Sequence, residues 1–237
     1  MQKKLSGKEI GETSFIVGYL LFLIVTGIIS LIQENYVLFI MIALLGVGDS
    51  FHLIPRIKKN LKGDFPKSDF YLGLGNQISS ITMTLFYLIL FFIVSSTYLI
   101  SIDGETLTVV PSLGNALKEI CYTTISYIID PTYEIIPSVI AYLTIIRIIL
   151  CLLPWNNWYK KEGNQAWAVI RNIPFIVIGL ITAGVAALSD GLTLPILIIL
   201  SFLFYIPVAL FAKKNPKLGM LMIPKTICYI LMIIYFL

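Results

Sequence analysis

Hydrophobic residues in this chain form long uninterrupted runs, and short polar segments separate these runs. A helix of about 20 apolar residues crosses the ~30 Å of hydrocarbon in a bilayer. Seven runs reach or approach that length, at residues 14–33, 36–56, 69–100, 134–154, 166–188, 192–212 and 218–236. The pattern predicts an all-α fold, a polytopic integral membrane seven-helix bundle that forms a single transmembrane domain over residues 1–237. The third run is longer than a bilayer requires, so we expect this helix to tilt or to project beyond the membrane.

Basic residues gather in the loops on one side of the predicted bundle. Of the 17 lysines and arginines, 13 lie before the first span or at and beyond the ends of the second, fourth and sixth spans, and only Lys118 lies on the other side. By the positive-inside rule we expect a cytoplasmic N-terminus and an external C-terminus. The expected location is a cell membrane, the cytoplasmic membrane of a prokaryote. The net charge of +4 follows from this topology, so no nucleic-acid partner is expected.

Residues 101–133 form the one sizeable segment outside the predicted spans. We expect a loop with a short strand at 106–110, followed by an amphipathic helix that packs on the outer helix ends, lies on the membrane surface or covers the mouth of the bundle. An eighth span at 115–130 would invert every later loop, so we reject it. Three tryptophans, Trp155, Trp158 and Trp167, fall at the predicted cytoplasmic interface, where indole rings anchor helices.

Costly polar side chains recur at one depth of the predicted bundle. With a rise of 1.5 Å per residue, five spans place such side chains about 8 to 10 Å inside the cytoplasmic boundary. Each central Asp, Arg or Lys costs roughly 2.5–3.5 kcal/mol in hydrocarbon. We therefore expect these side chains to face one another or a wet cavity; they are Asp49, Asn76, Gln77, Arg147, Arg171, Asn172 and Lys225.

The net positive charge of this layer indicates either a deprotonated lysine or an anionic guest. Asp49 contributes one negative charge, whereas Arg147, Arg171 and Lys225 contribute three positive charges. Phosphate and carboxylate are the natural guests, because a guanidinium offers both a bidentate fork. We expect these three cations, with Asn76, Gln77 and Asn172, to bind the substrate.

The acid and base of any reaction would be Asp49 and His52, the only histidine. Three structural alternatives remain open. Asp49 could form an ion pair with Arg147 or Arg171, Lys225 could extend toward the cytoplasm, and the amides could hold helices together. Arg56 is expected to be a cytoplasmic anchor. One histidine and three cysteines provide no metal-ligand spacing, so neither a metal nor another cofactor is expected.

A short part of the chain, roughly residues 44–90, resembles the lysoplasmalogenase-like membrane family. The resemblance rests on Gly48-Asp49 late in one span and on "FYLG", Phe70 to Gly73, at the start of the next. It implies hydrolysis of the vinyl-ether bond of lysoplasmalogens in a site open to the cytoplasm. Asp49 is the residue of this chain that matches a functional residue of that family. The family usually has a histidine where this chain has Ile81, and it usually has about eight spans.

Two classes of function fit these observations. The first is a cytoplasm-facing intramembrane site for an anionic lipid headgroup or small anionic metabolite, with or without hydrolytic chemistry. The second is a small-solute or ion transporter or channel that uses the same charged cluster, with protonation of Asp49 coupled to movement. The nearly uncharged outer halves of the spans disfavour the second. A purely structural role and a retinal protein are less consistent with the pattern.

Overall fold

The computed structural model describes residues 6–63, 65–103, 112–131, 134–160, 164–189, 191–211 and 215–237. In these ranges the fold is all-α without strands, and the predicted fold class is confirmed. The α-helices are α1 (Gly7–Ile32), α2 (Tyr36–Lys62), α3 (Ser68–Asp103), α4 (Leu113–Ile129), α5 (Ile135–Leu152), α6 (Gln165–Ser189), α7 (Thr193–Phe211) and α8 (Met222–Phe236). Two short 3₁₀ turns, η1 (Pro154–Asn156) and η2 (Pro216–Leu221), precede α6 and α8.

Seven of the helical segments in the described ranges are long and apolar enough to cross a membrane. They comprise α1, α2, α3, α5, α6, α7 and the segment Leu218–Phe236, which joins the end of η2 to α8. They coincide with the seven predicted runs, and the predicted multi-pass membrane protein is therefore supported. The 36 residues of α3 correspond to a length of about 54 Å, well beyond the ~30 Å of a hydrocarbon core.

Local chemistry explains where the first two helices begin and end. Ser6 and Glu9 form a capping box at the start of α1, in which each side chain accepts a hydrogen bond from the other residue's backbone N–H. Asn35 caps α2 by accepting from the N–H of Leu38 at 3.1 Å. Gly63 ends α2 at a φ of 82°, a backbone conformation that favours glycine.

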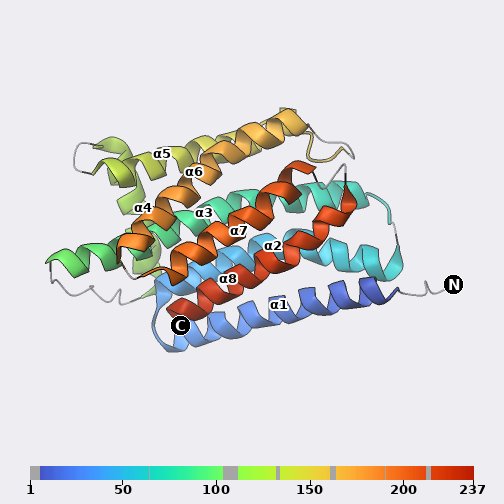
Figure 1. Cartoon of the computed structure of the whole chain (residues 1–237), viewed down its shortest axis with the longest axis horizontal. Coiled ribbons are helices and arrows are strands. Elements are labelled where there is room, and N and C mark those ends of the chain that lie inside the picture. Colours follow the sequence, from blue (N-terminus) through green and yellow to red (C-terminus); the bar gives the residue numbers. More distant parts are fainter. Residues whose placement is uncertain are drawn as a thin grey trace.

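The spanning helices alternate in direction, and the two termini lie at opposite ends of the bundle (Figure 1). As a result, the ends of α2, α5 and α7 lie with the beginnings of α1, α3, α6 and α8. These ends carry the loops that are rich in lysine. The core runs along the inner faces of the helices and includes Met41, Leu45, Phe86, Tyr87 and Tyr229.

Helices α2 and α3 pack closely because glycines face the contact. A Cβ added at Gly75 would collide with the carbonyl oxygen of Phe51 and the backbone of His52, and one at Gly48 would collide with Thr82. Pro55, inside α2, removes the N–H that would bond to the carbonyl of Phe51. The close approach therefore fixes the part of α2 that carries His52 against α3.

Helix α4 has 17 residues and lies at the end of the bundle opposite the N-terminus (Figure 1). Tyr127 stacks on Phe92 of α3 with ring centroids 6.2 Å apart, and Tyr142 of α5 donates to the carbonyl of Ile128 at 2.7 Å. Burial and the neighbouring Glu134 carboxylate raise the pKa of Tyr127. These contacts agree with the predicted connector packed on helix ends. The strand predicted at 106–110 lies outside the described residues.

Candidate functional site

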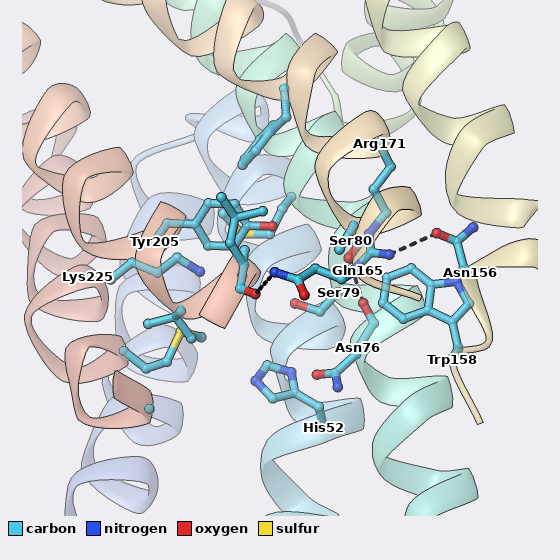
Figure 2. A pocket seen from close by; sticks show the side chains of 18 of the residues that line it. His52, Asn76, Ser79, Ser80, Asn156, Trp158, Gln165, Arg171, Tyr205 and Lys225 are labelled. Carbon is cyan, nitrogen blue, oxygen red and sulfur yellow. Dashed lines mark hydrogen bonds between the residues drawn. The ribbon is translucent and has the colours of Figure 1, made fainter. Parts of the chain in front are cut away.

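A cavity of about 490 Å³ lies inside the bundle at the end where α1 begins. Its walls come from α2, α3, α5, α6, α7 and α8, together with η1 and η2. Lys225 enters the cavity from one side and Arg171 from the other, with His52 and Asn76 between them in the view of Figure 2. Of the predicted site residues, the cavity wall includes His52, Asn76, Arg147, Arg171 and Lys225.

Arg147 is the largest charged side chain that is fully buried in the described structure. Its guanidinium lies over the ring of Phe175, with Cζ 3.7 Å from the centroid. Nη1 donates to Oδ1 of Asn172 at 3.3 Å and to the carbonyl of Arg171 at 3.4 Å. Among the described residues, Nε has no hydrogen-bond partner. An aromatic face and neutral oxygens therefore surround this cation.

Arg171 is held in a similar way in the cavity wall. Nη1 donates to Oδ1 of Asn156 at 2.8 Å, an interaction drawn in Figure 2. Its Cζ lies 4.0 Å from the ring centroid of Trp158. Asn156 is itself fixed in η1, because its Nδ2 donates to the carbonyls of Leu150 and Leu153. The guanidinium is thus oriented by an amide and an indole.

Lys225 completes the set of cations from the beginning of α8. Its side chain is buried, and Nζ lies 4.9 Å from the ring centroids of both Tyr205 and Tyr229. A desolvated cation–π contact contributes about 2 kcal/mol, so two such contacts are comparable with the roughly 2.5–3.5 kcal/mol cost of a central charge in hydrocarbon. The rings therefore offset the cost of burying this charge without neutralising it.

The charge of the cavity wall is positive. Within the described ranges, its lining contains three arginines, one lysine and one histidine, and neither aspartate nor glutamate. Arg56 forms an ion pair with Glu12 of α1, whereas no ion pair between described residues involves Arg147, Arg171 or Lys225. These three cations are the groups available to an anion. No metal-binding group of histidine, cysteine and carboxylate side chains occurs in the described ranges.

Asp49 lies beside this cavity, in the wall of an adjoining pocket of about 290 Å³ between α1, α2 and α8. Its carboxylate accepts hydrogen bonds from Tyr19 and Ser79, each at 2.8 Å. Nδ1 of His52 lies 4.0 Å from Oδ1 of Asp49. The structure thus gives Asp49 two hydroxyl partners in place of the ion pair with Arg147 or Arg171 that the sequence left open. His52 and Lys225 border both spaces.

The three amides predicted to bind substrate lie in different places. Asn76 lines the cavity. Gln77 instead joins α3 to the end of α5, because Nε2 donates to the carbonyl of Cys151 at 3.2 Å and Oε1 accepts from Tyr159 at 2.8 Å. Asn172 lies behind the wall, where Oδ1 accepts from Arg147 and from Tyr205. Asn172 therefore positions Arg147.

Several residues of the site were not among the predicted site residues. They are Asn156, Trp158, Phe175 and Tyr205 around the cations, and Tyr19 and Ser79 around Asp49. One signal was available: Phe175 follows Arg171 by four positions and so lies on the same helical face. Trp158 was predicted as an interfacial anchor, but its indole packs against Arg171 in the cavity wall. Trp155 and Trp167 stack on each other, with centroids 5.1 Å apart.

Chemically, the cavity offers guanidinium, ammonium, amide and hydroxyl donors around a space large enough for a headgroup or a small metabolite. The buried Nε of Arg147 and the ammonium of Lys225 are donors that a bound oxyanion could satisfy. No protein-family model matches the chain, and no curated protein and no solved structure shows significant similarity to it.

Proposed function

We propose that the cavity binds the anionic group of a membrane lipid or small metabolite that enters from the lysine-rich end of the bundle. The observation that carries the proposal is the positive wall without a carboxylate, described above for the resolved ranges. Buried charges are normally paired, because an uncompensated one is costly. Arg147, Arg171 and Lys225 have aromatic and neutral polar neighbours, which leaves their charges available to a guest.

The aromatic supports also explain how the site can remain ordered. Phe175, Trp158 and the pair Tyr205 and Tyr229 each lie against one of the cations. A ring face attracts a cation without cancelling its formal charge. A carboxylate would orient the same side chain but would also compete with the ligand. This arrangement favours reversible binding of an anion.

Hydrolysis is a second candidate, favoured by the place of His52. This residue borders the cavity and lies 4.0 Å from Asp49, so a proton could pass between Asp49 and a guest through it. The lysoplasmalogenase-like resemblance would assign the reaction to Asp49. The two hydroxyl bonds that Asp49 accepts and its absence from the cavity wall favour binding over catalysis. A transporter is disfavoured because the described cavity wall belongs to one half of the bundle.

The proposal is tested by placing a carboxylate beside Arg147. We expect the change Asn172→Asp to create an ion pair with Arg147, because Oδ1 already lies 3.3 Å from Nη1. Purified protein in neutral detergent is mixed with decyl phosphate, decanoate or decanol, and its melting temperature is measured. At 100 times the Kd, an anionic probe stabilises the folded protein by about 2.7 kcal/mol. Uncharged decanol has the same chain and measures the contribution of the tail.

We expect both anions to raise the melting temperature of the natural protein more than decanol, and Asn172→Asp to lose this difference. The matched control is Asn157→Asp, which makes the same change in a loop residue outside the cavity wall. A natural protein that responds equally to the anions and decanol would contradict the proposal. An unchanged anion response in a folded Asn172→Asp protein would also contradict it.

A further inference from the structure

The charges around the cavity give a quantitative indication of the guest. Arg147, Arg171 and Lys225 are cationic, and Asp49 in the adjoining pocket is the nearby carboxylate without a cationic partner at bonding distance. Arg56 and Glu12 neutralise each other. With His52 neutral, a net charge of +2 remains among these described residues. A guest with one negative charge would leave one buried cation uncompensated.

The hydrogen-bond donors around the cavity also favour a guest with more than one negative charge. Nε of Arg147 has no partner among the described residues, and Lys225 offers three N–H donors from a buried position. Arg171 uses Nη1 for Asn156 and retains the rest of its fork. A phosphate monoester has three terminal oxygens and a charge of about −1.5 to −2 at neutral pH. A carboxylate or a phosphodiester has two such oxygens and a single charge.

Resting on the function proposed above, we infer that the guest is a dianionic phosphate monoester. The apolar part of the wall, which includes Met83, Phe175, Val208, Leu210 and Met222, suits a hydrocarbon attached to the phosphate. The shared chemistry is the monoester dianion, whether a lipid or a soluble metabolite carries it. The cavity is expected to select guests by their number of negative charges, so that a dianion binds more tightly than a monoanion.

Probes with headgroups of different charge test this inference. Decyl phosphate, its methyl diester and decanoate share the same chain, and glycerol 3-phosphate represents a monoester without a chain. Their affinities are measured by titration in neutral detergent near pH 8, above the second phosphate pKa of about 6. We expect the natural protein to bind decyl phosphate about tenfold or more tightly than the diester or decanoate.

Removing one cation reduces the expected preference. Lys225→Met lowers the net charge by one. We expect its affinity for decyl phosphate to exceed its affinity for the methyl diester or decanoate by only about threefold or less. Lys225 has no hydrogen bond from a described residue that would be lost, and a buried charge can often be replaced by an apolar side chain without loss of stability. Lys58→Met is the matched control, since Lys58 contacts Phe65 and lies outside the cavity wall.

The outcomes separate the two proposals. If no anion binds better than decanol, the proposed function itself fails. If the diester and decanoate bind as tightly as decyl phosphate, the cavity binds anions but the monoester inference is wrong. Equal loss of selectivity in Lys58→Met and Lys225→Met would also overturn it. Glycerol 3-phosphate binding as tightly as decyl phosphate supports the inference and identifies a soluble source, and much weaker binding identifies a lipid.

Discussion

At the scale of single residues, the two classes of charge in this protein are held differently. The cations lie on aromatic rings, whereas the Asp49 carboxylate accepts hydrogen bonds from Tyr19 and Ser79. The depth of the charged residues could be predicted because hydrocarbon penalises each of them. Their partners could not, since Tyr19 and Ser79 each lie 30 positions from Asp49 and only tertiary packing brings them together.

The hydroxyl bond from Tyr19 should stabilise the carboxylate. Hydrogen bonds to charged groups contribute about 1.5–3 kcal/mol, so we expect Tyr19→Phe to lower the free energy of unfolding by about that amount. In an Asp49→Asn background the same change should cost less, because an amide needs the donor less than a carboxylate does. Unfolding in detergent, followed for all four proteins of this cycle, measures the coupling.

The control for this cycle is Tyr122→Phe on α4, where the side chain is 72% exposed and the loss of a hydroxyl should have no measurable effect. Equal destabilisation by Tyr19→Phe with and without the carboxylate would show that the hydroxyl does not act through Asp49.

At the scale of elements, the contact between α2 and α3 positions the site. Helix α2 contains Gly46 and Gly48, and α3 contains Gly73 and Gly75. Gly48 and Gly75 lie in the contact between α2 and α3. Gly73 instead accommodates the backbone of Trp158, and Gly46 faces Leu23 of α1. Small residues can thus be predicted to lie at an interface, but the sequence does not specify which neighbour each one meets.

Gly75→Ala should separate α2 from α3. The added Cβ would meet backbone atoms of Phe51 and His52, which cannot rotate away, and overpacking of this kind costs about 1–3 kcal/mol. We expect a lower melting temperature and weaker binding of decyl phosphate, because His52 and Asn76 would move apart. Gly18→Ala is the comparison: its Cβ meets nothing within 4 Å, and alanine favours a helix by about 1 kcal/mol. A Gly75→Ala protein as stable as Gly18→Ala would contradict the close contact.

At the scale of the whole molecule, hydropathy was sufficient to predict the seven spans, because bilayer thickness sets the length of a membrane helix. The packing of α4 on α3 and α5 could not be predicted in this way, because a helix of 17 residues outside the spans has no comparable length constraint. The sequence also predicts that the lysine-rich end, and with it the mouth of the cavity, faces the cytoplasm.

A native cysteine can test this orientation. Cys121 on α4 is exposed, whereas Cys151 and Cys228 are buried. We expect a membrane-impermeant maleimide to label Cys121 in intact cells or spheroplasts, and Cys121→Ser to abolish the labelling. Lys62→Cys, placed in the Cys121→Ser background at the opposite end of the bundle, should react only after permeabilisation. Labelling of Lys62→Cys from outside would invert the topology and turn the cavity toward the exterior.

The indole beneath Arg171 has a spectroscopic consequence. Trp158 faces the cavity, whereas the other two tryptophans of the chain, Trp155 and Trp167, stack on each other outside its wall. A guest that draws the guanidinium of Arg171 toward itself changes the electric field across the ring of Trp158 and therefore its emission. The protein thus carries its own optical reporter of occupancy in the wall of the cavity.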